Sequence, residues 1–444
     1  MIRRYTPKEM GGHWSDQSKY DHWLRVSLAI LETKAEMGMI PLDAVSLIRD
    51  HATVDVERVE YWDEGPGGMR HDMQAFTETV KESLRAAAVD EEVVAFFNKD
   101  VTSYDIEDSA LSLMLCEAVG IVMPLVSGLE QALFDLAKEH EETLMMGLTH
   151  GQPAEATTLA LKLLNFREMV KRDYGRLIIA SEAVRVGRLA GAVGNYGHLG
   201  PEAEAITCER LRLLSGLSTQ IIHRDVHANL MDTLVTVAAN IGHIAHNLWL
   251  MCQWPRCEAR EPFGKNQRGS TQMPHKKNPI TLERLRGMAQ QMIGYQTVAK
   301  MAVITYDERA IDQSCQERIN WPDAFCLLAY MLEKLTKLLP NMVFFPQAMQ
   351  ANIEKTKGQL GSSYVKDLLL GQGVTHLIYD DEKVQTYDWV KLCAHEAWER
   401  QVHLSDVLIE RGILEMVSAE SLEACFDLHR GLEHLSEIYD RYGL

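Results

Sequence analysis

Residues 230–251 decide the fold, and their sequence is LMDTLVTVAANIGHIAHNLWLM. Apolar side chains recur along this stretch in alternating steps of four and three, which is the spacing of a helix seam that packs against other helices. The members of the seam are Leu230, Leu234, Val237, Ile241, Ile244, Leu248 and Met251. At 1.5 Å per residue, a helix over this range is roughly 33 Å long. The stretch therefore predicts one long helix within a bundle.

Two further stretches repeat this spacing, one before and one after the helix. The first includes Val122, Leu125, Leu129, Leu133 and Leu136, and the second includes Phe325, Leu328, Leu332, Leu335 and Leu339. Strand-like alternation of β-branched residues is scarce along the chain. The pattern predicts an all-α protein of three helical domains: an N-terminal helical domain over 1–105, a central long-helix bundle over 106–351 and a C-terminal helical domain over 352–444.

Some of the expected helices have more than one apolar face. Leu163, Phe166, Met169 and Val170 lie beside polar positions that are too few to cover a whole helix. An uncovered apolar face favours association with another copy of the chain. We therefore expect a homo-oligomer that shares a helical core.

The composition is that of an ordinary globular protein with an acidic surface. The 444 residues are 46% apolar and 24% charged, and 45 Lys and Arg against 63 Asp and Glu give a net charge of −18. This charge predicts no general attraction to nucleic acid or to anionic membranes. The opening residues, MIRRYTPKEMGGHW, lack the apolar stretch of a secretory signal, and we expect polar residues to interrupt every later apolar run before it reaches membrane length. The expected location is cytoplasmic.

One segment concentrates side chains that can carry chemistry. Residues 269–283 read GSTQMPHKKNPITLE, in which Ser270 is followed by two adjacent lysines. A purely structural interpretation is available, because Asn278 is a good N-cap and Pro279 a good first residue for a helix that follows. The Gly and Pro residues indicate an exposed loop, and loops carry function more often than packed elements do. Both interpretations stay open from the residues alone.

This segment resembles the signature of the fumarase/aspartase superfamily, which reads Gly-Ser-Ser-x-Met-Pro-x-Lys-x-Asn-Pro and has a Glu four residues later. The matching residues are Ser270, Met273, Pro274, Lys276, Asn278, Pro279 and Glu283, with Thr271 at the second serine position. The resemblance implies an enzyme that eliminates fumarate, or a close analogue, from a succinyl adduct. It also implies a homotetramer with a shared helical core.

Within the superfamily, the chain resembles the adenylosuccinate lyase family over nearly its whole length. The similar segments are RRYTPKEMGGHW with Arg4 and Tyr5, MRHDMQAFT with His71, VTSYDIEDSAL with Thr102 and Ser103, GLTHGQPAEATT with Thr149 and His150, STQIIHRDVHANL with Gln220, and ERAIDQSCQERINWPDA with Arg309, Ser314 and Arg318. The resemblance implies a C–N lyase of purine biosynthesis that acts on two small-molecule substrates, adenylosuccinate and the succinylated aminoimidazole carboxamide ribotide. It implies no cofactor and no metal.

The resemblance assigns catalytic roles to five residues. They are Ser270 as the general base, His150 as the general acid, Glu283 as the carboxylate partner of that histidine, Lys276 as the cation that stabilises the doubly charged carboxylate, and His71 as a helper at the phosphate or the leaving group. The roles fit the chemistry of the side chains. A serine must be activated by nearby positive charge and backbone donors, and a carboxylate partner raises the pKa of a histidine.

The resemblance also assigns substrate binding to a larger set of residues. They are Arg4, Tyr5, Thr102, Ser103, Thr149, Gln220, Met273, Asn278, Arg309, Ser314 and Arg318. The arginines fit this role because a guanidinium can bind a phosphate through two parallel hydrogen bonds. Asp100, His223, Thr271 and Asp307 depart from the family's pattern, and none of them removes a catalytic residue.

Several alternatives stay open at this point. His71 beside an aspartate could be a surface pair, and Arg309 with Arg318 could belong to a solvated helix face. His223 and His227 lie one helical turn apart, but no third ligand converges on them, so a metal site is disfavoured. Two other functions compete: a lyase or cycloisomerase of the argininosuccinate or carboxymuconate type, and a non-catalytic scaffold that keeps the fold. The arginines argue against the former, and the complete set of catalytic residues argues against the latter.

Overall fold

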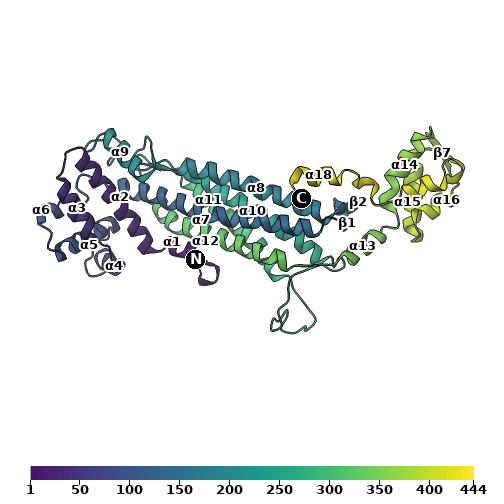
Figure 1. Cartoon of the computed structure of the whole chain (residues 1–444), viewed down its shortest axis with the longest axis horizontal. Coiled ribbons are helices and arrows are strands. Elements are labelled where there is room, and N and C mark those ends of the chain that lie inside the picture. Colours follow the sequence, from purple (N-terminus) through teal and green to yellow (C-terminus); the bar gives the residue numbers. More distant parts are fainter. Residues whose placement is uncertain (1) are drawn as a thin grey trace. The chain divides into compact units, whose positions relative to one another are not determined.

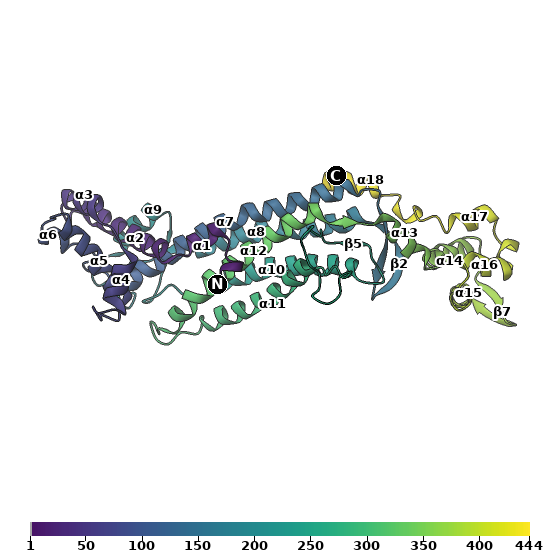
Figure 2. The same ribbon diagram turned by 90° about the horizontal axis from the view of Figure 1, so that it is seen from below.

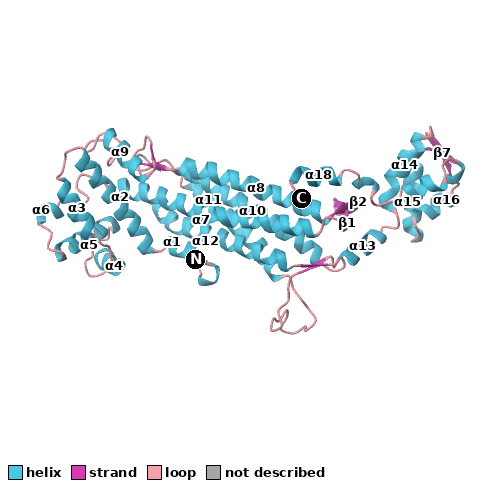
Figure 3. Ribbon diagram, viewed as in Figure 1, coloured by secondary structure: helices cyan, strands magenta, loops and turns pink. Residues whose placement is uncertain are grey.

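The computed structural model describes residues 2–444, which form helices joined by loops with a few short strands (Figure 3). The strands pair in four two-stranded sheets. The prediction of an all-α protein is confirmed, because the helices carry the architecture and the sheets only join them.

Two compact units make up the chain, and each unit draws on three separate segments. The first unit comprises Met1–Leu129, Val170–His243 and Arg284–Leu335, and the second comprises Glu130–Met169, Ile244–Glu283 and Thr336–Leu444. The division into three domains at residues 105 and 351 stays a prediction.

Five long helices supply segments to both units. They are α7 (Ser103–Glu139), α8 (Leu159–Val184), α10 (Asp225–Cys252), α11 (Ile280–Met301) and α12 (Asp312–Leu338). In the first unit, the segments of these helices run side by side in both views (Figures 1 and 2). The predicted seam lies on α10, and each of its members is at most 2% exposed. The apolar period of this stretch therefore identified both the helix and its buried face.

Buried polar contacts also join the long helices within the first unit. Asn240 of α10 donates to the carboxylate of Asp173 of α8 at 2.9 Å. Arg224, just before α10, donates at 2.7 Å both to Asp108 of α7 and to Glu317 of α12. The side chains of Arg224 and Asp108 are each 1% exposed. Both buried charges are therefore paired, as a low-dielectric interior requires.

Shorter helices form a second part of the first unit around an apolar core of their own. Trp23, Phe76 and Phe97 lie in this core and are at most 4% exposed. The elements of the first unit other than the long helices are η1 (Arg3–Tyr5), α1 (Lys8–His13), α2 (Asp16–Glu36), α3 (Leu42–His51), α4 (Val56–Asp63), α5 (Asp72–Ala86), α6 (Glu91–Val94), β3 (Val186–Gly187), α9 (Pro201–Leu211) and β4 (Leu214–Ser215).

The second unit contains a β-hairpin, a small sheet and a cluster of C-terminal helices. Its elements are β1 (Leu144–Thr149), β2 (Gln152–Thr158), β5 (Ala259–Arg260), η2 (Leu339–Asn341), β6 (Val343–Phe344), α13 (Pro346–Glu354), η3 (Gln359–Gly361), α14 (Ser362–Gly371), β7 (His376–Tyr379), β8 (Glu382–Gln385), α15 (Thr386–Arg400), α16 (Leu404–Glu410), η4 (Ile413–Glu415), α17 (Ala419–Ala424), η5 (Arg430–Leu432) and α18 (Leu435–Tyr442). The C-terminal cluster has its own apolar core, in which Trp389 is fully buried.

Helix α7 departs from the expectation that polar residues interrupt every apolar run. It contains an 18-residue window with a mean hydropathy of 2.0, which is long and apolar enough to cross a membrane. However, 56% of that window is buried inside the protein. The expectation was wrong for α7 because a core helix covered by other helices needs few charges, just as a membrane helix does.

Candidate active site

The motif segment forms a loop between β5 and α11, and Figure 1 shows it projecting away from the helices. A hydrogen bond, which we call the clasp, joins its two sides. The Asn278 side-chain amide donates to the carbonyl oxygen of Gly269 at 2.8 Å. An added Cβ at Gly269 would lie 1.8 Å from the carbonyl oxygen of Lys276, so only glycine fits there. Gly269 and Asn278 therefore shape the loop in addition to any contact with substrate.

Glu261 fastens the start of this loop to its end. Its buried carboxylate accepts the backbone N–H groups of Thr281 at 3.2 Å and of Leu282 at 2.7 Å. These N–H groups belong to the first turn of α11, where a helix has no internal partner for them. Glu261 therefore caps α11 from a position some twenty residues earlier in the chain. The structural interpretation of Asn278 as the cap of this helix is replaced by this long-range cap.

Ser270 lies inside the loop with its hydroxyl oxygen already accepting hydrogen bonds. The backbone N–H groups of Met273 and Gln272 donate to Ser270 Oγ at 3.0 and 3.3 Å. Donors aimed at an oxygen favour its negatively charged form. Lys276 is exposed on the same loop and makes no ion pair with any described residue. Within one chain, backbone donors therefore surround the candidate base, while the candidate cation stays solvated.

His150 lies at the tip of the hairpin formed by β1 and β2. Thr149 pairs with Gln152, so His150 and Gly151 form a two-residue turn, and both have positive φ values, 53° and 77°. Such a turn matches the twist of the two strands and presents its residues to solvent. Thr149 and His150 are both exposed, and His150 makes no hydrogen bond or ion pair within residues 2–444.

Glu283, the predicted partner of His150, instead accepts a hydrogen bond from Trp249 Nε1 at 3.1 Å. Glu283 lies in the first turn of α11, and both residues of this contact belong to the second unit. Within residues 2–444, the two residues of the predicted acid pair, His150 and Glu283, are therefore not in contact.

A separate group of predicted residues gathers at the start of α7 in the first unit. The backbone N–H of Thr102 donates to the Asp105 carboxylate at 2.9 Å, which ties the residue before the helix to its first turn. Asp105 is itself held by Arg188 at 2.8 Å, and both side chains are at most 2% exposed. The helix start that carries Thr102 and Ser103 is thus fixed by a buried ion pair.

Arg309 and Gln220 meet beside this helix start. The guanidinium of Arg309 donates to Gln220 Oε1 at 3.2 Å and lies 3.8 Å from the ring centroid of Tyr104. Burial raises the pKa of the Tyr104 hydroxyl, and Ser314 is hydrogen-bonded to that tyrosine. The ring positions the arginine through a cation–π contact.

Arg318 lines the same cavity as Tyr104 and faces two carboxylates. It donates to Asp72 and lies 3.9 Å from Glu107. Asp72 follows His71, whose Nδ1 is 3.9 Å from it. Burial raises the pKa of Glu107 to about 8, and the carboxylate of Asp72 adds to this shift. A cavity of about 180 Å³ opens here, lined among others by Trp14, Lys19, Tyr104, Glu107, Ser314 and Arg318.

Three predicted residues lie apart from these groups. Arg4 is exposed and makes no hydrogen bond or ion pair with any described residue. Tyr5 packs edge-on against Tyr330 of α12, with ring centroids 5.2 Å apart. Met273 is 42% exposed on the loop. Over the same residues, 2–444, no group of three His, Cys, Asp or Glu side chains could hold a metal ion.

Sequence reasoning missed four residues of the first-unit group: Lys19, Asp72, Tyr104 and Glu107. A signal was present for two of them, because Tyr104 and Glu107 are three apart at the start of a helix that follows the Thr102–Ser103 pair. Residues at this spacing share a helix face. No comparable signal marks Lys19, which comes from a different helix, α2.

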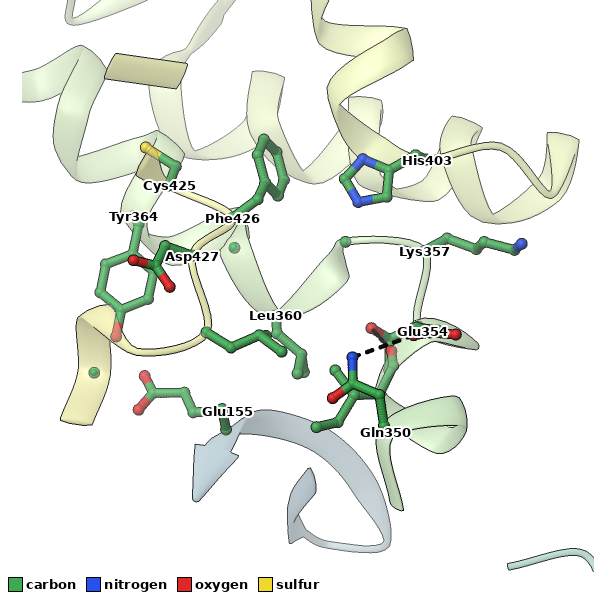
Figure 4. Close-up of a pocket in the computed structure, with 17 residues that line it drawn as sticks. Glu155, Gln350, Glu354, Lys357, Leu360, Tyr364, His403, Cys425, Phe426 and Asp427 are labelled. Carbon is green, nitrogen blue, oxygen red and sulfur yellow. Dashed lines mark hydrogen bonds between the residues drawn. The ribbon is translucent and has the colours of Figure 1, made fainter. Parts of the chain in front are cut away.

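A larger cavity, of about 320 Å³, lies in the second unit (Figure 4). Its labelled walls include Glu155, Tyr364, His403 and Phe426. None of the sequence-predicted site residues lines it.

The helical fold and the serine-bearing loop together define a lyase of the all-helical class. The family described as Lyase matches residues 4–294. The chain is 36% identical over 446 residues to an adenylosuccinate lyase of Bacillus subtilis, covering 100% of both proteins. It is also 36% identical over 444 residues to an adenylosuccinate lyase of Thermotoga maritima, covering 100% of this chain and 99% of that protein. The chain belongs to the adenylosuccinate lyase family.

Solved structures share the fold at lower sequence identity. A fumarate lyase from Mesorhizobium sp. BNC1 superposes with a TM-score of 0.86 at 22% identity, covering 100% of this chain and 99% of that one. A β-carboxy-cis,cis-muconate cycloisomerase from Acinetobacter calcoaceticus superposes with a TM-score of 0.83 at 21% identity, covering 98% and 97%. These likenesses establish the architecture.

Proposed function

We propose that this chain eliminates fumarate from adenylosuccinate to give AMP, and from the succinylated aminoimidazole carboxamide ribotide. The observation that carries the proposal is the full-length identity to adenylosuccinate lyases, combined with a loop in which backbone donors surround Ser270. The reaction breaks a C–N bond after a proton leaves the carbon beside a carboxylate. It therefore needs a base, an acid and positive charge at the carboxylate.

Ser270 is the proposed base. Its two backbone donors lower the cost of the alkoxide, and Lys276 would add the positive charge once the loop encloses the substrate. Lys276 and the free amide hydrogen of Asn278 are the proposed donors to the doubly charged carboxylate. Thr102 and Ser103 would donate hydroxyls to the succinyl group.

His150 is the proposed acid, and it protonates the departing nitrogen of the purine or imidazole. We propose that its partner Glu283 comes from another copy of the chain, because the described chain leaves His150 without a partner. Large apolar side chains on the long helices support a homotetramer: Ile179, Ile293 and Ile319 are 70%, 53% and 66% exposed. Each is unusually exposed for an isoleucine on a long helix.

The first-unit group is the proposed nucleotide site. Arg309 and Arg318 would bind the phosphate, with Ser314 and Gln220 adding polar contacts and His71 helping at this end. Arg4, Tyr5, Thr149 and Met273 are proposed to complete the substrate contacts. A cytoplasmic location is supported by the cysteines, since all eight are free thiols.

Ultraviolet absorbance tests the proposal directly, because breaking the C–N bond changes the chromophore of the purine. Purified protein is mixed in parallel with adenylosuccinate, argininosuccinate and carboxymuconate. We expect a spectral change only with adenylosuccinate, together with release of equal amounts of AMP and fumarate. Turnover of either other compound with no change on adenylosuccinate would contradict the proposal.

A further inference from the structure

The cavity beside Arg318 has an unusual charge balance for a site that should bind an anion. Its charged lining consists of three cations, Lys19, Arg224 and Arg318, and four acidic side chains, Asp16, Glu107, Asp108 and Glu317. Arg224 is paired with Asp108 and Glu317, which leaves Lys19 and Arg318 as the cations next to Glu107. Glu107 is only 12% exposed and lies 3.9 Å from Arg318, whose guanidinium is also held by Asp72. An anion that enters this cavity must therefore bind a guanidinium that two carboxyl groups already face.

Asp72 and Glu107 contact Arg318 differently. Asp72 is the closer partner and forms the direct hydrogen bond to Arg318. Burial is the largest cause that raises the pKa of Glu107 to about 8, a shift to which Asp72 contributes and which Arg318 opposes. Near neutral pH, Glu107 is therefore a mostly protonated group next to the guanidinium, and it ionises within the range in which enzymes are assayed.

Resting on the proposed function, we propose that Glu107 is a positioning residue for Arg318, and that binding of the nucleotide phosphate is coupled to uptake of one proton by Glu107. Protonated Glu107 has no charge with which to compete with phosphate for the guanidinium, which is then paired with Asp72 alone. Ionised Glu107 competes with the phosphate. A dianionic phosphate next to Glu107 makes its ionisation still less favourable, so the proton is held in the complex.

The titratable and charged groups that face Glu107 or line its cavity come from several elements. They are Asp16 and Lys19 on α2, Asp72 at the start of α5, Tyr104 and Asp108 on α7 itself, Arg224 before α10, Arg309 before α12, and Glu317 and Arg318 on α12. Asp108 is neutralised by Arg224 at 2.7 Å. Lys19 could also take up a proton on anion binding, because burial lowers its pKa and Arg318 lowers it further. The experiment must therefore separate Glu107 from Lys19.

Calorimetric titration with AMP, the proposed product, measures the coupling on the intact protein. The binding heat is compared at each pH in two buffers with different ionisation enthalpies, which gives the number of protons taken up. For a group that titrates at about 8, we expect uptake of about half a proton per site at pH 8 and about 0.9 at pH 9. The AMP phosphate is already dianionic there, since its second pKa is about 6.

Glu107→Gln keeps the shape of the protonated side chain and removes its titration. We expect this variant to take up almost no proton and to bind AMP at pH 9 about tenfold more tightly than the parent. Glu117→Gln is the matched control: Glu117 lies on the same helix, but pairs with His22 and Arg25 outside the cavity. It should keep the parent's proton uptake.

Three results would overturn the inference. The first is AMP binding by the parental protein with no proton uptake at pH 8 and 9, which decides the question even if Glu107→Gln fails to fold. Uptake that persists in Glu107→Gln but disappears in Lys19→Met would assign the proton to Lys19. An unchanged pH dependence of AMP affinity in folded Glu107→Gln would reject the positioning role. Failure of the proposed function is distinguishable, since AMP would then not bind and adenylosuccinate would not be turned over.

Discussion

Ser270 and Arg318 illustrate how differently a single chain prepares its functional side chains. Ser270 Oγ already accepts two backbone N–H groups, so its immediate surroundings favour the charged form. Arg318 is held by Asp72 before any substrate arrives. Loss of either side chain should therefore affect a different kinetic constant.

Ser270→Ala should abolish turnover while leaving binding nearly intact, because the hydroxyl acts only when the proton is transferred. We expect kcat to fall by about 10²- to 10⁴-fold, the range for general-base catalysis. Absorbance assays give kcat, and calorimetry with AMP gives the affinity. Thr271→Ala, one residue further along the same loop, is the control and should stay within about threefold of the parent. A kcat for Ser270→Ala within tenfold of the parent would move the base elsewhere.

Arg318→Leu and Arg309→Leu should each raise the KM for both purine substrates, since both substrates carry the same ribose phosphate. A lost charged hydrogen bond is worth about 2 to 3 kcal/mol, which is a rise of about 30- to 150-fold. Arg85→Leu is a matched control, because Arg85 pairs with Glu78 and Glu91 at 2.6 and 2.7 Å outside the cavity. Normal KM values in both site variants would identify these arginines as a solvated face.

The same residues show where prediction from sequence ends. Ser270, Arg309 and Arg318 stand in segments that resemble the family's motifs, and this resemblance nominated them, whereas the residues alone left a structural interpretation open. Glu107 was not nominated, because its importance depends on burial next to Arg318, some two hundred residues away in the chain. The pKa of a side chain depends on its burial and on the charges of neighbours that are distant in the chain, and neither can be predicted from the local sequence.

At the scale of elements, the spacing of apolar residues along the sequence predicted the helices most reliably. The seam of α10 is buried along its whole length, because a helix hides the residues that recur every three to four positions. The loop before α11 was also recognised from its Gly and Pro residues. The residue that caps α11 was not recognised. The local sequence suggested Asn278, whereas the cap is the buried carboxylate of Glu261, which directly follows β5 at the start of the loop.

Glu261→Ala should destabilise the protein and also slow turnover, because it releases the first turn of α11 and the loop end joined to it. We expect a loss of about 1 to 2 kcal/mol in the free energy of unfolding, the usual cost of a lost helix cap, and a fall in kcat. Urea denaturation and absorbance assays measure the two effects.

Asp55→Ala supplies the comparison, because Asp55 caps α4 by accepting the N–H of Glu57 at 2.9 Å. It should cost about 1 kcal/mol in stability without changing kcat. If Glu261→Ala lost stability in the same way and kept the parental kcat, anchoring of the loop would have no part in catalysis.

At the scale of the whole molecule, the main question is which copy of the chain supplies His150 to a site and which supplies Glu283. His150 lies at the tip of the β1–β2 hairpin and Glu283 in the first turn of α11, and His150 has no partner within residues 2–444. Exposed isoleucines on the long helices support the proposal that another copy covers these surfaces. Sequence motifs could nominate both residues, but which copy supplies each one is a property of assembly and not of local pattern.

Mixing two inactive variants tests whether copies share a site. His150→Ala and Ser270→Ala are dissociated together and allowed to reassociate. We expect part of the parental activity to return, because some sites then combine an intact histidine from one copy with an intact serine from another. Each variant treated alone is the control. No recovery, under conditions in which labelled subunits demonstrably exchange, would place both residues in one chain.

The fastening of the loop by Glu261 has a consequence for proteolysis. A protease that cuts the exposed segment between Ser270 and Lys276 would leave both new ends attached, one through Glu261 and the other through the first turn of α11. The hydrogen bond between Asn278 and Gly269 and those between Glu261 and the first turn of α11 would still link the two sides of the cut. Nicked protein should accordingly stay in one particle and still bind AMP, while losing the ability to enclose a substrate. Limited digestion would thus separate recognition of the nucleotide from the chemical step without any mutation.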